Sequence, residues 1–207
     1  MVAAVNSYEE SVLGALDAGV DVIVSGAGLP LQLPGLAAGH PRGKDTALVP
    51  IVSSGRAAEI LLKRWGKAGR VPDAFVVEGP EAGGHLGWKT AQEIADPANR
   101  LEHILEEVLE VTRRYGGFPV IAAGGVYTRD DVFRMLDLGA SGVQMGTRFL
   151  ATVESGADEE FKRVLVQCRP EDIMVADSPG SPCGLPFRII RQSPMYRATL
   201  EGSRPVK

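Results

Sequence analysis

The sequence predicts an α/β fold in which parallel strands alternate with helices. Short apolar runs bounded by Gly or Pro recur along the chain and alternate with segments of helical periodicity. Most residues that could take part in catalysis or ligand binding follow directly after these runs. In α/β proteins, ligands bind at the carboxyl ends of the strands. A length of 207 residues suits one large domain of this class.

The expected strands are six apolar runs that have the length and composition of buried parallel strands. They span residues 2–5, 20–24, 47–52, 74–77, 119–122 and 142–145. All but the first lead into turns or loops that contain glycine, as expected where a strand meets a crossover.

Five segments with helical periodicity lie between or after these runs, at 8–18, 56–68, 100–115, 128–138 and 158–168. Ser7 and Thr128 stand where N-cap residues are expected. In the helix at 128–138 we expect Val132, Phe133 and Leu136 to face inward. The segment 29–45 contains several Pro and Gly residues and is expected to form a loop or lid.

Composition and charge exclude several classes of protein. A net charge of −4 gives no electrostatic reason to expect a nucleic-acid partner. No apolar run approaches the roughly 20 residues of a membrane span, and we expect no signal peptide, since the opening residues 1–5 look like a strand. Cys168 and Cys183 lack the spacing of a metal site or a disulfide framework. We therefore expect a cytoplasmic protein with reduced thiols and no metal.

The loop at 78–85, with the sequence EGPEAGGH, is the first candidate site. It follows a predicted strand, carries two carboxylates, and ends in His85, one of three histidines in the chain. Its three glycines allow a close approach of backbone to a ligand, and histidine exchanges protons near neutral pH. The alternatives are a histidine that caps a helix and, at Glu78, a solvated carboxylate. His40 and His103 are expected in solvent.

Two glycine turns at the last strands indicate a phosphate site. Gly124-Gly125 follows the fifth apolar run and Gly146-Thr147 follows the sixth. In (β/α)8 barrels the loops after strands 7 and 8 often hold a phosphate. A doubly wound sheet is the alternative, but its usual Gly-x-Gly-x-x-Gly after the first strand is absent. Tight turns without a ligand would explain the same glycines.

Counting back from strands 7 and 8 makes the run at 2–5 the third strand. The sequence thus predicts a TIM-type (β/α)8 barrel that lacks the first two β/α units. This partial barrel would span residues 1–190 and be followed by a C-terminal tail at 191–207.

Five segments resemble, in order and at about the expected spacing, the flavin-dependent nitronate monooxygenase family, formerly called 2-nitropropane dioxygenases. The related flavin-containing enoyl-ACP reductases share the pattern. The segments are VSGAG at 24–28, PIVSS at 50–54, EGPEAGGH at 78–85, IAAGGV at 121–126 and QMGTRF at 144–149.

The resemblance implies a TIM-barrel flavoprotein that binds FMN, with a histidine above the flavin. His85 matches that catalytic histidine, as a base or as a polar group that orients the substrate carbon. The implied cofactor-binding residues fall into three sets: Ser25, Gly26 and Glu78 at the flavin ring or ribityl chain, Gly124, Gly125, Gly146 and Thr147 at the phosphate, and Gly83, Gly84 and Met145 in addition. The stretch 177–188 resembles a loop near the active site in these enzymes.

By this resemblance the protein is an oxidoreductase, an FMN-dependent monooxygenase that oxidises nitronates with O2. Its partners would be a small-molecule substrate and O2 or NAD(P)H, with no nucleic acid and no membrane. One alternative is an NAD(P)H-dependent FMN reductase of enoyl thioesters or quinones. Another is an inactive truncated barrel. A homodimer would form if a second copy covers the exposed barrel edges.

Overall fold

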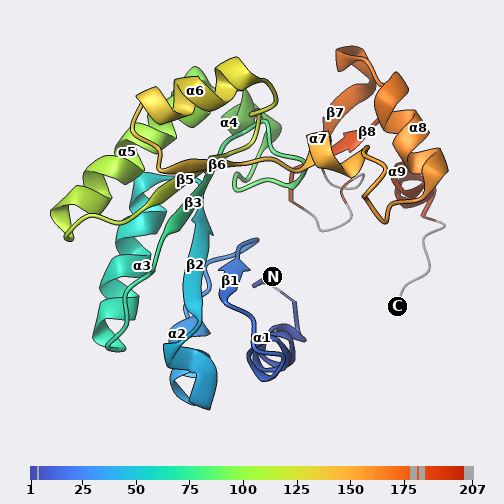
Figure 1. The fold of residues 1–207 in the computed structure, drawn as a ribbon. Helices are drawn as coiled ribbons and strands as arrows, with labels where there is room; N and C mark the ends of the chain where they lie inside the picture. Colours follow the sequence, from blue (N-terminus) through green and yellow to red (C-terminus); the bar gives the residue numbers. More distant parts are fainter. Residues whose placement is uncertain (4, 178–180, 182–184, 203–207) are drawn as a thin grey trace.

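The main body of the protein is a parallel five-stranded sheet in the order β1-β2-β3-β5-β6. The structure is a computed structural model of the chain and describes residues 1–3, 5–177, 181 and 185–202. The strands are β1 (Val22–Ser25), β2 (Ala47–Val52), β3 (Phe75–Glu78), β5 (Val120–Ala123) and β6 (Gly142–Gln144) (Figure 1). Each new strand joins the same side of the sheet, as in a barrel, whereas a doubly wound sheet reverses its order.

Five of the predicted strands are confirmed to within two residues, a normal uncertainty for element ends. The strand predicted at 2–5 is wrong for the residues that the structure describes there. Only Val2 forms a bridge, to Gly26, while Met1 and Ala3 exchange hydrogen bonds with the Gly26 backbone. The chain turns away after this short contact, since Tyr8 N donates to Val5 O at 3.1 Å and Val5 is exposed. Ala4 lies outside the described residues.

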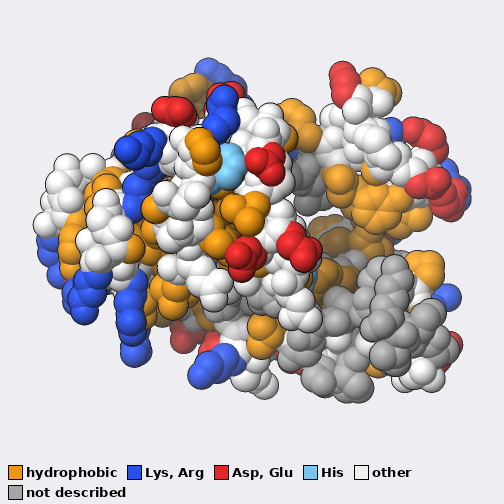
Figure 2. Space-filling view, turned by 90° about the horizontal axis from the view of Figure 1, so that it is seen from below, with side chains coloured by type: hydrophobic (Ala, Val, Ile, Leu, Met, Phe, Trp, Pro, Cys, Tyr) orange, Lys and Arg blue, Asp and Glu red, His pale blue; other side chains and the backbone are white. Residues whose placement is uncertain are grey.

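Helices cover one face of the sheet and form the main hydrophobic core with it. They are α1 (Tyr8–Asp17), α2 (Leu33–Ala38), α3 (Gly55–Lys67), α5 (Leu101–Arg114) and α6 (Arg129–Asp137), and two of them stand on the left of Figure 1 as α3 and α5. Basic side chains occupy the last turns of α3 and α5, where they complement the helix dipole. Figure 2 shows Lys and Arg gathered on that side of the molecule.

The segment 29–45 is helical, which corrects the expectation of a loop or lid. It contains α2 and the 3-10 helix η1 (Pro41–Lys44). Leu33 and Ala37 are buried in the main core, and Trp65 Nε1 donates a hydrogen bond of 3.2 Å to Pro30 O. The segment is therefore the crossover between β1 and β2, because its apolar residues pack under the sheet.

Two details of the predicted helices also change. Ser7 occupies the N-cap position of α1, but its side chain makes no capping hydrogen bond. In α6 the buried residue is Met135, while Phe133 and Leu136 are 48% and 38% exposed. The helix is rotated from the expected orientation, and Val132 alone of the expected inward residues packs against the core.

The other face of the sheet, here called the inner face, carries a much smaller apolar cluster. Its buried members are Val49, Ala74, Val76 and Ala123. Side chains alternate between faces along a strand, so their neighbours Leu48, Val52, Phe75, Val77 and Ala122 point into the helix-side core. The inner face is the side that a closed barrel would enclose.

A second lobe stands beside the sheet, on the right of Figure 1, and the sequence did not predict it. Its antiparallel sheet has the order β4-β8-β7, from β4 (Gly84–His85), β8 (Phe187–Ile190) and β7 (Ile173–Ala176). Two short elements lie between β4 and α5, namely α4 (Ala91–Ala95) and η2 (Pro97–Asn99). After β6 come α7 (Thr147–Leu150), α8 (Glu159–Gln167) and η3 (Pro170–Asp172), and α9 (Pro194–Leu200) follows β8.

The helix expected at 158–168 is confirmed as α8, and α9 lies within the predicted tail. The division of the chain at residue 190 remains a prediction. Among the described residues, none of the helices is long and apolar enough to cross a membrane.

Candidate functional site

Three residues lie side by side on the inner face, at the carboxyl end of the sheet. Glu78 ends β3 and is in register with Ala123 of β5, which in turn is in register with Gln144 of β6. Ala123 belongs to the inner cluster, so Glu78 and Gln144 share its face. Gln144 is exposed. The sequence interpretation did not select Gln144, although the alternation of faces from Val143 would have indicated it.

Glu78 is the most strongly perturbed acid of this region. Burial raises the pKa of its carboxyl group from 4.5 to about 7. Burial is the only cause of this shift, since a carboxylate loses hydration in a partly apolar setting. Glu78 is thus a strand-end acid that is half-buried rather than fully solvated, and near neutral pH its protonated and ionised forms are comparably populated.

Ser25 and Met145 point to the opposite face. The Ser25 hydroxyl is fully buried and pairs with the Tyr8 hydroxyl of α1 at 2.9 Å. Met145 packs against the helix-side core. Neither side chain faces the row of Glu78 and Gln144, so these two residues can offer only their main chain to a ligand on the inner face.

Gly26 follows β1 and lies closely against β2. A Cβ atom placed on Gly26 would be 2.8 Å from Ile51 Cβ, which is closer than real side chains approach. Gly26 is therefore required by packing of the backbone on Ile51. Its role as a cofactor contact stays a prediction.

The loop after β3 lies directly on the glycine turn after β5. Gly124 and Gly125 have φ values of 89° and 83°, in the left-handed region. A Cβ on Gly124 would be 3.0 Å from Ala82 N, and a Cβ on Gly125 would collide with the Glu81 carboxylate. The fold thus brings two of the sequence-predicted site segments into contact, and this contact itself requires both glycines.

The same loop reaches the glycine turn after β6. A Cβ on Gly83 would be 3.9 Å from the Thr147 hydroxyl oxygen, whereas Gly146 has open space around it. Both Gly146 and Thr147 are exposed. Arg148 places its guanidinium 4.6 Å from the centre of the Tyr127 ring, so the turns after β5 and β6 are linked by a cation–π contact.

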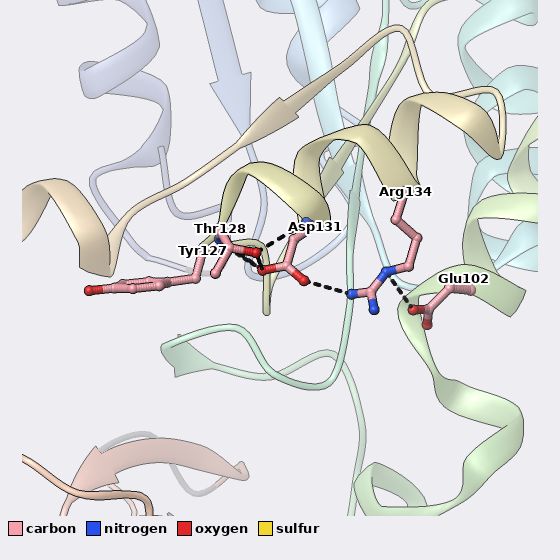
Figure 3. Close-up of polar contacts among 5 residues, drawn as sticks. All are labelled: Glu102, Tyr127, Thr128, Asp131 and Arg134. Carbon is pink, nitrogen blue, oxygen red and sulfur yellow. Dashed lines mark hydrogen bonds and ion pairs between the residues drawn. The ribbon is translucent and has the colours of Figure 1, made fainter.

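A capping box fixes the start of α6, directly after the glycine turn (Figure 3). The Thr128 hydroxyl accepts a hydrogen bond from Asp131 N at 3.2 Å, and Thr128 N donates to the Asp131 carboxylate at 2.8 Å. Arg134 bridges Asp131 at 3.0 Å and Glu102 of α5 at 3.5 Å. The N-cap predicted at Thr128 is confirmed. The turn containing Gly124 and Gly125 therefore lies between the loop after β3, which packs on it, and the capping box that begins α6.

His85 lies in strand β4 and does not cap a helix. It is in register with Phe187 of β8, and the two rings meet edge to face with centroids 4.8 Å apart. Leu86 N donates to Pro186 O at 3.1 Å, which extends the pairing by one residue. Gly84, with φ of 79°, turns the chain into this strand. His85 is exposed, so its imidazole is accessible to a substrate.

The other two histidines lie elsewhere. His103 is exposed, as expected. His40, in contrast, accepts a hydrogen bond from Arg42 N through Nδ1, and its Nε2 is 3.0 Å from the Asp17 carboxylate. Its side chain is only 15% exposed, which corrects the expectation of a solvated residue.

Among the described residues, neither Cys168 nor the acids form a metal centre. Cys168 is a free thiol whose pKa is raised by burial and by the charge of Asp172. Half of the stretch 177–188 that resembles an active-site loop, including Cys183, lies outside the described residues, and its last two residues, Phe187 and Arg188, begin β8. Within the described part of the chain, no cluster of three or more His, Cys, Asp or Glu residues could hold a metal ion.

Two small cavities flank Pro80 and Glu81. One, of about 240 Å³, is lined by Gly124 and Gly125 together with Arg100 and Arg134. The other, of about 360 Å³, lies between α4 and the second lobe. Neither is lined by Glu78 or His85.

Comparison with known proteins shows what the whole chain is similar to. The model of the nitronate monooxygenase family matches residues 1–200. A curated "probable nitronate monooxygenase" of Staphylococcus haemolyticus is 36% identical over 106 residues, and one of Staphylococcus aureus is 33% identical over 135 residues. The matched regions cover 51% and 62% of this chain but only 29% and 36% of those proteins.

Solved structures support the same fold. FabK from Thermotoga maritima matches with a TM-score of 0.71 and 28% identity, over 95% of this chain and 54% of that one. The nitroalkane oxidase from Streptomyces ansochromogenes matches with a TM-score of 0.68 and 26% identity, over 95% of this chain and 58% of that one. The chain thus spans little more than half of these structures, and by its match over nearly the whole sequence it belongs to the nitronate monooxygenase family.

Proposed function

We propose that the protein is an FMN-dependent oxidoreductase that oxidises nitronates with O2. The observation that carries the proposal is the contact of the His85 loop with Gly124-Gly125 together with its position beside Thr147. A loop with a titratable group lies next to two turns of the kind that bind phosphates in barrels. The family match and the names of the curated relatives support the same reaction.

The residues fit a flavin mononucleotide in three respects. The turns after β5 and β6 offer backbone N–H groups at Gly124, Gly125 and Gly146, with the Thr147 hydroxyl as a further donor. Arg148 supplies a positive charge beside them. Glu78 and Gln144 lie on the inner face, where polar groups could contact the ring system. Ser25 and Met145 would contribute their main chain, since their side chains face the helices.

In this proposal FMN accepts the electrons that leave the substrate, and the protein supplies binding, orientation and control of the proton. The exposed imidazole of His85 would donate a hydrogen bond to an oxygen of the nitronate, or would take the α-proton if the neutral nitroalkane binds. Glu78, with a pKa of about 7, would change charge near neutral pH.

The test uses the 207-residue chain itself. Purified chain should bind FMN at a ratio of about 1:1 and then consume oxygen when propyl-2-nitronate is added. His85→Asn should retain the flavin absorbance and lose most oxygen uptake, because the substitution removes the imidazole that orients the nitronate but leaves the turns in place. A chain that binds FMN fully but consumes no oxygen with any nitronate would contradict the proposed reaction.

A reductase remains the alternative, because the flavin-containing enoyl-ACP reductases share the five sequence segments that resemble the nitronate monooxygenases. In that case NAD(P)H would reduce the flavin, and an enoyl thioester or a quinone would be the acceptor. Anaerobic mixing of the FMN-loaded chain with NADH separates the two, since rapid loss of flavin absorbance without nitronate favours the reductase.

An inactive partial barrel is the third reading. A chain that fails to bind FMN at any concentration tested would support it. Sizing of the chain in solution would show whether a homodimer covers the sheet edges at β1 and β6. The expected cytoplasmic location remains a prediction from the sequence.

A further inference from the structure

We propose that Arg188 is the positioning residue of the His85 loop: its guanidinium, which comes from the second lobe, holds two backbone carbonyls of the loop and so fixes where His85 stands. The significance of this for catalysis rests on the proposed function. The clamp itself is a property of the fold and can be tested without a substrate.

The geometry of the clamp is bidentate. Arg188 Nη2 donates to Pro80 O at 2.8 Å, and Arg188 Nε donates to Ala82 O at 3.1 Å. These carbonyls belong to the segment that lies on Gly124 and Gly125. One planar group with donors in a fixed fork therefore sets the spacing of two carbonyls.

The partial burial of Arg188 strengthens its two hydrogen bonds to the loop. Arg188 is half-buried, and burial lowers the pKa of its guanidinium, which the charge of Glu81 partly offsets. The described structure gives Arg188 no carboxylate within ion-pair distance, so backbone carbonyls replace the water that the charged group has lost. Hydrogen bonds to a charged group in such a place are stronger than those between neutral groups.

The pairing of β4 with β8 connects Arg188 to the position of His85. Arg188 is in register with Gly84, and Phe187 is in register with His85. The same strand thus holds Pro80 and Ala82 through a side chain and His85 through its backbone and a ring contact. Movement of Arg188 would move the loop on both sides of Gly83.

The loop needs such a support because it is rich in glycine. Gly79, Gly83, Gly84 and Gly87 lose more conformational entropy on ordering than any other residue type would. The apolar contacts of the loop are few, with Ala82 and Leu86 buried in the main core. The hydrogen bonds from Arg188 therefore help to offset the entropy lost when this loop is ordered, since few buried apolar contacts do so.

Hydrogen exchange of the whole chain tests the clamp directly. In Arg188→Lys, amides in the segment 82–86 should exchange about tenfold faster than in the original chain, because lysine keeps the charge but cannot hold both carbonyls in one plane. Arg191→Lys is the matched control, since Arg191 is exposed and lies three residues further along. It should leave exchange at 82–86 unchanged, and β2, β3 and β5 should be unaffected in both variants. Equal exchange at 82–86 in both variants would overturn the proposal.

The original chain offers a second test in case Arg188→Lys does not fold. The Leu86 amide donates to Pro186 O. It should exchange as slowly as the amides that join β7 and β8. Exchange of Leu86 at the rate of an unprotected amide would show that the loop is not held by β8, and the proposal would fail.

The catalytic consequence has its own readout. In the FMN-loaded chain, Arg188→Lys should lower kcat for nitronate about tenfold and shift the pH dependence of kcat, with the FMN ratio unchanged and Arg191→Lys like the original chain. A fall in FMN binding alone would assign Arg188 a purely structural role and would count against the positioning of His85. If exchange responds as expected while no variant oxidises nitronate, the clamp stands and the proposed reaction fails.

Discussion

The His85 imidazole meets the Phe187 ring edge to face, with centroids 4.8 Å apart and an angle of 71° between the planes. The two residues are paired across β4 and β8, so both the strand pairing and the ring contact hold His85 next to Phe187. The candidate catalytic residue is therefore oriented by the second lobe, which is built from the C-terminal part of the chain.

Phe187→Leu should release the imidazole while keeping an apolar side chain in place. We expect the ring proton signals of His85 in the NMR spectrum to shift, because the ring current of Phe187 is lost, and the signals of His40 and His103 to stay where they are. Phe133→Leu is the control, since Phe133 is exposed on α6 and contacts Arg129. Identical His85 signals in the Phe187→Leu variant and the original chain would show that the ring contact does not form in solution.

Glu78 should make the protein less stable as the pH rises. Its pKa in the folded chain, about 7, is above the value of 4.5 in the absence of burial. The folded state therefore binds more protons between these values, and the stability that the neutral form provides is lost as pH rises through about 7. A full pKa unit corresponds to about 1.4 kcal/mol, so the effect is of the order of a few kcal/mol.

Urea denaturation at pH 5 and pH 8 measures this effect. Glu78→Gln should remove most of the difference in unfolding free energy between the two pH values and should be more stable than the original chain at pH 8. Glu106→Gln, on the exposed side of α5, should keep the original pH dependence. A pH dependence that survives in Glu78→Gln would mean that another group is responsible.

Gly124→Ala should destabilise the protein through both its backbone and its contacts. An L-residue in the left-handed region costs roughly 1–2 kcal/mol, and the added methyl group would press on Ala82 N and Gly79 O, each 3.0 Å away. Gly66→Ala is the control, because Gly66 lies in α3 with nothing near its Cβ position. It should stabilise the chain by about 0.5–1 kcal/mol. Thermal unfolding of the two variants in opposite directions is the expected result.

The sequence was sufficient to predict the parallel sheet because its signals are local. The apolar run Ala47–Val52 and the periodic helix Leu101–Arg114 can each be recognised from the pattern of neighbouring residues alone. The glycine turns and the His85 loop were assigned to one end of the sheet for the same reason. Their mutual contact, seen at Gly124 and Ala82, follows from the parallel order of β3 and β5.

The second lobe could not be predicted in this way. Arg188 and Ala82 are 106 residues apart in the chain, and the two-residue strand Gly84–His85 has no strand propensity of its own. It becomes a strand only because β8 lies beside it. The run Phe187–Ile190 did carry a signal, since it is an apolar segment with a single arginine, but nothing local identified its partner.

The faces of Ser25 and Met145 follow from the alternation of side chains along a strand. The side chain of Ile23 faces the helices, and a strand alternates with a period of two, so Ser25 must also face the helices. A motif position alone does not distinguish a side-chain contact from a main-chain contact. That distinction leads to the last prediction.

Ser25→Ala should reduce stability without reducing affinity for FMN. The Ser25 hydroxyl is fully buried and bonded to the Tyr8 hydroxyl, so its removal costs about 1 kcal/mol and leaves a buried donor or acceptor unpaired. Tyr8→Phe should cost a similar amount, and the double variant should cost less than the sum, because the two residues share one hydrogen bond. The dissociation constant for FMN, measured by flavin fluorescence, should be the same in Ser25→Ala and the original chain. A tenfold weaker affinity in Ser25→Ala, with Tyr8→Phe unchanged, would show instead that the hydroxyl turns to the inner face when the cofactor binds.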